Sequence, residues 1–254
     1  MPRDIGKFRP RRPKKMNHAL MAMILNGIND IKKGNVFVLQ VGAHDGKMDD
    51  PIFNTSQKYG WGGLLIEPHP AYFSDLETVY KDNEKVEIVN CGISSDEGTM
   101  PLYYLNEDAR PAYPTWMRGC ASLEKDRMLQ AIEKSQVTGR DTDSDIAFTE
   151  INMRRLDNLL KERSVKSADI VVIDVEGHEL SVMNSFNLKK LKVSAAIVEC
   201  NGVNVEQEDE YVAALEKASL DVYRLNDDLV GLKPDAINIP IEDLLHFFGK
   251  SVHA

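Results

Sequence analysis

Acidic side chains gather at the ends of two strongly apolar segments of the chain. Asp174, Glu176 and His178 lie at and just after the end of one segment, and Glu199 lies near the end of the other. In an extended chain residues 174, 176 and 178 point to one side, and paired parallel strands stand about 4.8 Å apart. Because buried carboxylates are costly unless they bind a cation or exchange protons, we predict that these four side chains are catalytic.

Two other interpretations of these acids remain open. Glu176 and Glu179 would favour the positive end of a helix at 179–187, which would leave His178 as a surface residue. The oxygens of four side chains could also hold Mg²⁺ or a similar hard ion, although we do not expect a metal. That ligand set would be Asp174, Glu176, Glu199 and Asn201.

A glycine-containing loop follows the first apolar run. Its sequence, Gly42-Ala43-His44-Asp45-Gly46, allows a tight turn and a close approach of a ligand to the backbone. The loop is not a dinucleotide fingerprint, which needs glycine at positions 44 and 47, and no phosphate-binding G-K-[ST] follows it. Glu67 stands about 20 residues further on, where an acid can accept hydrogen bonds from both ribose hydroxyls. Capping of a helix at 70–81 is its alternative role.

The glycine loop and Glu67 together predict a pocket for a nucleoside without a recognised phosphate. Asn90, Cys91 and Gly92 end another apolar run and could line an adenine edge, although a simple turn explains them equally well. A nucleoside pocket with an acidic floor suits S-adenosylmethionine, whose sulfonium is positively charged. Methyl transfer to a hydroxyl needs alignment, exclusion of water, and either a general base or a divalent ion.

Short apolar runs alternate with helical stretches along most of the chain. The runs are too apolar for a one-sided sheet and too short for buried helices, which predicts parallel strands covered on both faces. Segments 220–225 and 229–234 predict a hairpin that adds an antiparallel strand. A helix with apolar residues from Leu20 to Ile31 precedes the first strand, and Gly34 is positioned to cap it. Strands are expected at 36–41, 63–67, 86–91, 169–175 and 195–200, and helices at 52–59, 70–81, 154–163, 179–187 and 208–218.

This pattern predicts an α/β fold with a mostly parallel sheet of about seven strands and helices on both faces. Residues 106–149 interrupt the alternation with a helical stretch at 122–135 and a turn-rich stretch at 138–145. Long insertions in compact domains are usually functional, so we expect a lid over the acceptor; a surface excursion without function is the alternative. Stacking and polar contacts to an acceptor would come from Trp116, Tyr113, Arg110 and Arg118.

Charge is distributed unevenly over the 254 residues. The net charge is −9, yet residues 1–15 hold seven Lys and Arg against Asp4. We expect a flexible basic arm at 1–15 and a single domain at 16–254, and no nucleic-acid partner, because the remainder of the chain is acidic. No run approaches the roughly 20 apolar residues of a membrane span. The three cysteines indicate neither a disulfide framework nor a thiolate metal site. With no secretory signal after the basic stretch, a cytoplasmic protein is expected; the oligomeric state is not indicated.

Four strings of the sequence share an order and spacing with a known family. They are VFVLQVGAHDG (36–46), GLLIEPHP (63–70), RRLDNLL (154–160) and DIVVIDVEGHELSVM (169–183), and together they cover roughly residues 35–200. In these strings the chain resembles the FkbM family of S-adenosylmethionine-dependent methyltransferases. The resemblance implies a class I methyltransferase fold of Rossmann-like type, usually acting on hydroxyls of sugars or natural products.

Carried over by motif, the glycine loop and Glu67 would hold the cofactor, and Asp174, Glu176 and His178 would border the transferred methyl group. Many members of the family carry an acid two residues before the glycine, where this chain has Gln40, an amide that can donate a hydrogen bond but supplies no charge. The complete set of expected cofactor contacts is Gln40, Gly42, Ala43, His44, Asp45, Gly46, Glu67, Pro68, Cys91, Gly92 and Asp174.

We therefore expect an S-adenosylmethionine-dependent O-methyltransferase whose acceptor is a hydroxyl of a carbohydrate or small natural product. A metal-assisted O-methyltransferase is the first alternative. A nicotinamide-dependent dehydrogenase on the same sheet is disfavoured by the missing glycines. A non-catalytic nucleoside- or nucleic-acid-binding protein that keeps the pocket is the alternative from another class.

Overall fold

The computed structural model describes residues 14–225, 227–240 and 243–244. The predicted basic arm therefore lies outside the described residues up to position 13. Its last two residues, Lys14 and Lys15, already belong to the first helix, α1 (Lys14–Ile31). Gly34 follows this helix with φ +78° and donates its N–H to the carbonyl of Asn29, which confirms the expected left-handed cap.

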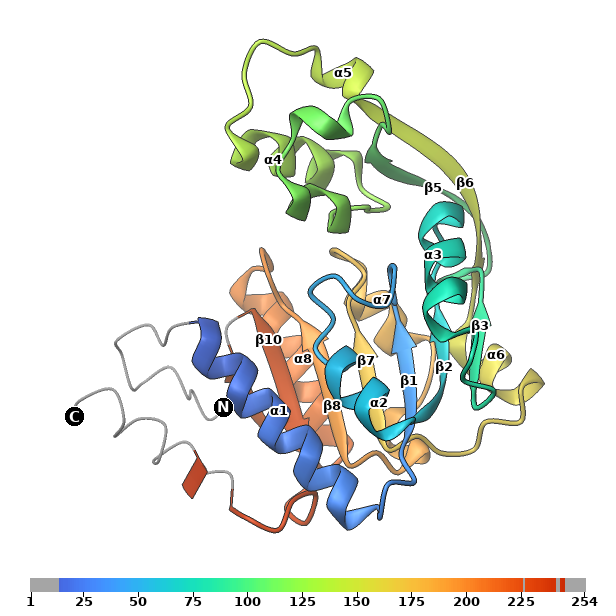
Figure 1. The fold of residues 1–254 in the computed structure, drawn as a ribbon, viewed down its shortest axis with the longest axis vertical. Coiled ribbons are helices and arrows are strands. Elements are labelled where there is room, and N and C mark those ends of the chain that lie inside the picture. Colours follow the sequence, from blue (N-terminus) through green and yellow to red (C-terminus); the bar gives the residue numbers. More distant parts are fainter. Residues whose placement is uncertain (1–13, 226, 241–242, 245–254) are drawn as a thin grey trace, which may run out of the picture.

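One sheet of seven strands forms the centre of the molecule (Figure 1). Its order is β3-β2-β1-β7-β8-β10-β9, and every pair from β3 to β8 is parallel. Strand β10 pairs antiparallel with both β8 and β9, which confirms the predicted hairpin. The strands are β1 (Phe37–Val41), β2 (Gly62–Ile66), β3 (Val86–Val89), β7 (Ile170–Ile173), β8 (Ala195–Glu199), β9 (Asp221–Leu225) and β10 (Asp228–Leu232).

Helices cover both faces of this sheet, as expected for strands whose side chains are almost all buried. One face packs against α1 and its neighbours through a cluster that includes Leu25, Val38 and Trp61. The other packs through Leu39, Leu159 and Tyr211 against the helices drawn behind the sheet in Figure 1. The helices on the α1 side are α2 (Phe53–Tyr59) and α3 (Pro70–Tyr80). The helices on the opposite face are α6 (Leu156–Glu162), α7 (Glu179–Asn184) and α8 (Val205–Lys217). A short helix, η4 (Leu188–Leu191), precedes β8.

A second, smaller sheet rises from the edge of the first and was not predicted. Its order is β4-β6-β5, with β4 parallel and β5 antiparallel to the long strand β6. The segment between β5 and β6 packs around a small core of its own, which includes Leu105, Met117 and Met128. The elements are β4 (Gly92–Ile93), β5 (Gly98–Leu105), η2 (Arg110–Ala112), η3 (Thr115–Gly119), α4 (Lys125–Ser135), α5 (Thr142–Asp145) and β6 (Ile146–Arg154).

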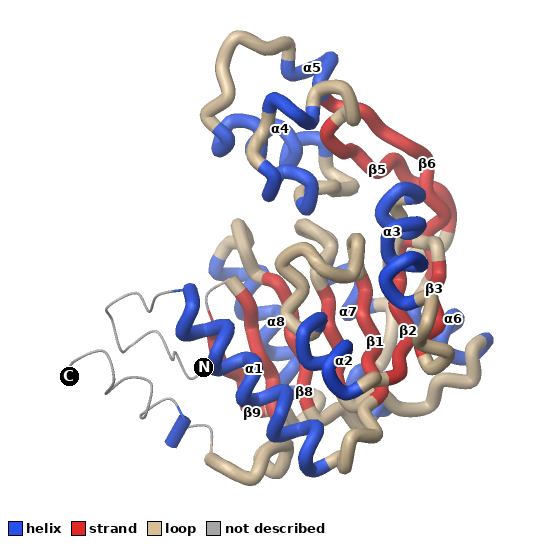
Figure 2. Tube along the Cα trace, viewed as in Figure 1, coloured by secondary structure: helices blue, strands red, loops and turns tan. Residues whose placement is uncertain are grey.

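This small sheet carries the segment predicted as a lid. Figure 2 shows α4 and α5 held by β5 and β6 across from the carboxyl ends of the central strands. The insertion therefore follows directly after β5 and ends within β6, and these two strands pair along eight residues each. Among the described residues, no helix is long and apolar enough to cross a membrane.

Candidate active site

A cavity of about 700 Å³ lies where the central strands end and the insertion faces them. This volume is within the range of small-molecule sites. Its wall combines strand ends, the insertion and α1, represented by Gly42, Glu67, Asp174, Trp116, Arg127 and His18. The position agrees with the general rule that ligands of open α/β sheets bind beyond the carboxyl ends of the strands.

Gly42 packs against the end of β7. Its φ is +82°, and a Cβ atom there would lie 1.7 Å from the carbonyl oxygen of Asp174. Its N–H and that of Ala43 both donate to the carbonyl of Ile66 at 3.0 Å. Only glycine fits this conformation and this approach, so the first loop is fixed against the ends of both neighbouring strands.

Glu67 holds the glycine loop to the start of α3. Its carboxylate is buried and accepts hydrogen bonds from the backbone N–H groups of His44 and His69, both at 2.8 Å. Burial raises the pKa of Glu67 to about 7, and the two N–H donors oppose this shift. The helix-capping alternative is met in part, since Glu67 accepts from the N–H of His69, the residue that precedes α3, while the side chain of His69 makes no capping hydrogen bond.

Gln40 does not face the cavity. It is buried in β1, and its amide nitrogen donates to Asp50 at 3.2 Å. The other carboxylate oxygen of Asp50 accepts from the N–H groups of Ile52 and Phe53 at the start of α2. Asp50 itself lines the cavity. In this structure Gln40 therefore positions an acid of the site instead of meeting a ligand directly.

Some of the other expected cofactor residues line the cavity, whereas Ala43, Asp45 and Gly46 do not. Ala43 and Gly46 pack against α3, where a Cβ on Gly46 would lie 2.6 Å from Leu76. Asp45 accepts from two N–H groups of its own loop and lies 3.4 Å from the guanidinium of Arg118. The residues that do line the cavity are Gly42, His44, Glu67, Pro68, Cys91, Gly92 and Asp174.

Three carboxyl groups lie close together beyond the end of β7, the strand end that Gly42 packs against. Asp174, Glu176 and Glu199 each place one oxygen within 4.8 Å of the other two. The expectation that residues 174 to 178 stay extended is wrong: β7 ends at Ile173, and Glu176 and Gly177 have φ values of +53° and +108°. This turn brings Asp174 and Glu176 to Glu199, which lies on the neighbouring strand.

Burial gives this carboxyl cluster unusual proton affinity. It raises the pKa of Asp174 well above its usual range, and the nearby Glu176 and Asp228 add to the shift. The pKa of Glu199 is raised by burial and by Asp174. Burial also raises the pKa of Glu176 to about 7, where Arg127 opposes the shift. The cluster therefore binds protons more tightly than ordinary carboxyl groups do, and a positive charge beside it would weaken that binding.

The turn after β7 directs His178 away from the cluster. Its Nε2 lies 3.1 Å from the hydroxyl of Ser94, although the side chain still lines the cavity. Burial lowers the pKa of His178. The structure therefore unites three of the four expected catalytic residues and sets the fourth beside them with a different partner.

The insertion contacts the carboxyl cluster. The Arg127 guanidinium lies 3.4 Å from both Glu176 and the carbonyl oxygen of Asn201, and the hydroxyl of Ser122 donates to the Glu176 carbonyl at 2.8 Å. A Cβ on Gly177 would meet Arg127 at 2.6 Å. The conformation described here therefore has the insertion docked on the turn after β7.

Of the four residues expected to grip an acceptor, only Trp116 lines the cavity, with 40% of its surface exposed. Tyr113 is buried in the core of the insertion, and its hydroxyl donates to Asp145 at 2.7 Å. Arg110 pairs with Glu107, and Arg118 pairs with Asp45 and Asp75. The expectation for these three is wrong, because each is already engaged by the protein.

Sequence reasoning missed three residues that shape the site. Arg127 was not singled out within its helix. Asp228 pairs in register with Glu199 across β8 and β10, and burial raises its pKa to about 7. Glu179, predicted only as a charge near a helix end, accepts from the N–H groups of Val175 and Gly177 and from the hydroxyl of Tyr211. Asp228 becomes visible only when the strand order is known.

The fold and the site together define a class of protein. A doubly wound sheet with one reversed strand near its edge, and a cavity at the carboxyl ends of its central strands, is the arrangement of class I methyltransferases. The sequence matches the family described as "Methyltransferase FkbM domain" over residues 40–224. The chain belongs to this family.

Individual relatives are distant. A protein named methyltransferase sdnD from Sordaria araneosa is 26% identical over 214 residues, which cover 75% of each chain. Among solved structures, an FkbM methyltransferase from Methylobacillus flagellatus KT matches with a TM-score of 0.48 and 13% identity, over 78% of this chain and 44% of that one. Fibrillarin from Aeropyrum pernix, solved with S-adenosyl-L-methionine, matches with a TM-score of 0.39 and 10% identity, over 78% and 65%.

Proposed function

We propose that this methyltransferase uses S-adenosylmethionine to methylate a hydroxyl group of a carbohydrate or small natural product. The observation that carries this proposal is one cavity with two different ends. A glycine loop held by Glu67 forms one end, and the carboxyl cluster around Asp174 forms the other, with the insertion across both.

The residues present fit the proposed donor. Glycine at position 42 keeps the floor of the cavity free of side-chain atoms, and Glu67 offers a buried acid beside it. S-adenosylmethionine supplies a methyl group on a positively charged sulfur. The glycine loop and Glu67 would hold its nucleoside, and Asp174 with Glu199 would stabilise positive charge in a region of low dielectric.

The acceptor side follows from the insertion. Trp116 presents an indole at the cavity wall, a surface on which sugar rings and other flat or apolar groups stack. Arg127 and Ser122 hold the insertion against the turn after β7, which excludes water from the reacting groups. We therefore propose that residues 106–149 act as a lid over the acceptor.

Calorimetry with S-adenosylmethionine, S-adenosylhomocysteine and NAD tests the donor. We expect binding of the first two and none of NAD. A variant with Glu67 replaced by Ala should bind weakly, whereas Glu84→Ala, an exposed change outside the cavity, should bind normally. Absence of binding by the unaltered protein would overturn the proposal.

Transfer of a labelled methyl group to a panel of sugars, glycosides and phenols tests the acceptor class. The linkage in the product is then established by NMR. An ether at a former hydroxyl supports the proposal, and a product methylated on nitrogen or carbon contradicts the O-methyl assignment.

A further inference from the structure

His178 has two ring nitrogens in different surroundings. Nε2 lies 3.1 Å from the Ser94 hydroxyl, and Ser94 is buried. Nδ1 has no hydrogen-bond partner among residues 14–225, and it is not sealed from solvent. The side chain lines the cavity. Which nitrogen carries the hydrogen of the neutral ring therefore decides whether the open nitrogen can accept a proton.

Ser94 is the first member of a chain of three serine hydroxyls. Its Oγ lies 3.0 Å from that of Ser181, and the Ser181 hydroxyl donates to Ser95 Oγ at 3.2 Å. Ser95 in turn donates to a carboxylate oxygen of Asp96 at 3.0 Å. The Ser95 N–H also donates to Ser181 Oγ at 3.0 Å.

The direction of this chain follows from its last member. Ser95 donates to Asp96, and this bond uses its single hydroxyl hydrogen. Ser181 must then donate to Ser95, which uses its only hydrogen. Ser94 must therefore donate to Ser181. The oxygen of Ser94 is left as an acceptor, and His178 must present a hydrogen on Nε2.

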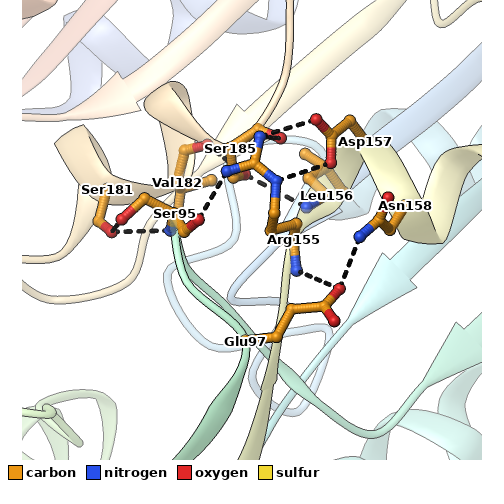
Figure 3. A network of polar contacts seen from close by, with 9 residues as sticks. All are labelled: Ser95, Glu97, Arg155, Leu156, Asp157, Asn158, Ser181, Val182 and Ser185. Atoms are coloured by element: carbon orange, nitrogen blue, oxygen red, sulfur yellow. Dashed lines mark hydrogen bonds and ion pairs between the residues drawn. The ribbon is translucent and has the colours of Figure 1, made fainter.

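Arg155 fixes the middle of the chain in space. As Figure 3 shows, its guanidinium donates to the Ser95 carbonyl at 2.6 Å and to both carboxylate oxygens of Asp157. The same group donates to the carbonyl of Ser185 on the α7 side. The base of the small sheet is thereby joined to the segment that bears Ser181. The three linked serine hydroxyls span these two parts of the fold, and Arg155 holds the two parts together.

We propose that this serine chain holds His178 with its hydrogen on Nε2 and leaves Nδ1 as the general base of methyl transfer. The inference rests on the proposed function above. The acceptor oxygen bonds to the methyl carbon, the carbon–sulfur bond breaks with its electron pair going to sulfur, and the hydroxyl proton goes to Nδ1. Ser94, Ser181 and Ser95 are positioning residues, since none of them needs to touch the acceptor.

The neighbouring groups are consistent with this role. Burial lowers the pKa of His178, while the charges of Glu179 and Glu124 oppose the shift, so the ring is neutral at neutral pH. Asp174 and Glu199 face each other and Glu176 within the carboxyl cluster, where burial and repulsion between carboxyl groups raise the pKa of both. His178 is a side chain of the cavity wall outside that cluster, and its Nδ1 has no hydrogen-bond partner among the described residues.

Nitrogen-15 NMR of the histidine rings tests the hydrogen placement without any turnover. His178 is assigned by comparison with His178→Gln, and the pattern of ring correlations distinguishes the two neutral forms. We expect the Nε2–H form in the unaltered protein and a mixture in Ser94→Ala. A hydrogen on Nδ1 in the unaltered protein would overturn the proposal. If Ser94→Ala does not fold, Asp96→Asn at the exposed end of the chain should also produce a mixture, since its amide can donate to Ser95.

Kinetics complete the test. Ser94→Ala should lower kcat about 10-fold, the effect of one neutral hydrogen bond to the base, with the donor affinity unchanged. Ser94→Thr, which keeps the hydroxyl, should restore it. Ser56→Ala is the matched control, because it removes a buried hydroxyl away from the cavity. A Ser94→Ala protein with both the Nε2–H form and full kcat contradicts the proposal. Failure of the proposed function would instead appear as absent donor binding with the ring hydrogen still on Nε2.

Discussion

Substitution of Gly42 by Ala gives the sharpest test of how the glycine loop is built. The new Cβ would start 1.7 Å from the carbonyl oxygen of Asp174, and atoms in such contacts must separate to at least 3.0 Å. The residue would also keep a positive φ of +82°. The left-handed conformation costs about 1–2 kcal/mol, and forced separation in a packed region costs about 1–3 kcal/mol more.

Gly34→Ala provides a matched control within the same chain. Gly34 has nearly the same φ, +78°, but no atom of the described residues lies within 4 Å of the added Cβ. It should therefore show only the conformational cost. Urea unfolding should place Gly42→Ala about 2–5 kcal/mol below the unaltered protein and Gly34→Ala about 1–2 kcal/mol below it.

Donor binding should separate the two variants further. Widening the gap between Gly42 and Asp174 moves the floor of the cavity, so calorimetry should show weaker binding of S-adenosylhomocysteine by Gly42→Ala and unchanged binding by Gly34→Ala. Equal stability of the two variants, together with unchanged affinity, would refute the reasoning that the close approach builds the site.

Three further predictions follow from the site. The free energy of unfolding should fall as pH rises from about 4 to about 7, because burial raises the folded-state pKa of Glu67, Glu176 and Asp228 to about 7 while unfolded carboxyls titrate near 4, so the folded protein binds more protons in that window. The fall should continue above pH 7, because burial and Asp174 raise the pKa of Glu199 to about 11. Urea midpoints measured across this pH range test the prediction. Glu67→Gln should make the free energy of unfolding depend less on pH. A free energy of unfolding that rises from about pH 4 to about pH 7 would contradict the prediction. Arg127→Met should raise the acceptor KM about 5-fold, the effect of losing one partly buried ion pair, that with Glu176. Lys125→Met on the same helix should leave the acceptor KM unchanged, because Lys125 pairs with the exposed Asp143. Equal KM values for the two variants would show that Arg127 does not contribute to acceptor binding. Exhaustive chelation should leave methyl transfer intact, since Arg127 already supplies a positive charge to the carboxyl cluster; activity that returns only with added Mg²⁺ would assign the cluster to a metal.

The sequence by itself determined the central sheet and its direction. Runs such as 170–173 are apolar on both sides, and in so short a run this pattern is typical of strands covered on both faces. The order of the glycine loop, Glu67 and the acids after 169–175 also placed the cavity, because parallel strands end at the same edge. These features follow from local composition and from chain order, which are visible without a structure.

Only the tertiary structure decided which side chains meet. Gln40 and Asp45 lie in the expected motif, yet Gln40 supports Asp50 and Asp45 holds its own loop. Asp228 reaches the carboxyl cluster because β10 inserts between β8 and β9, and no local pattern encodes that order. Side-chain direction depends on positive φ values at Glu176 and Gly177 and on partners distant in sequence, such as Ser94. Such contacts are set by packing between segments, so the spacing of residues along the chain could not predict them.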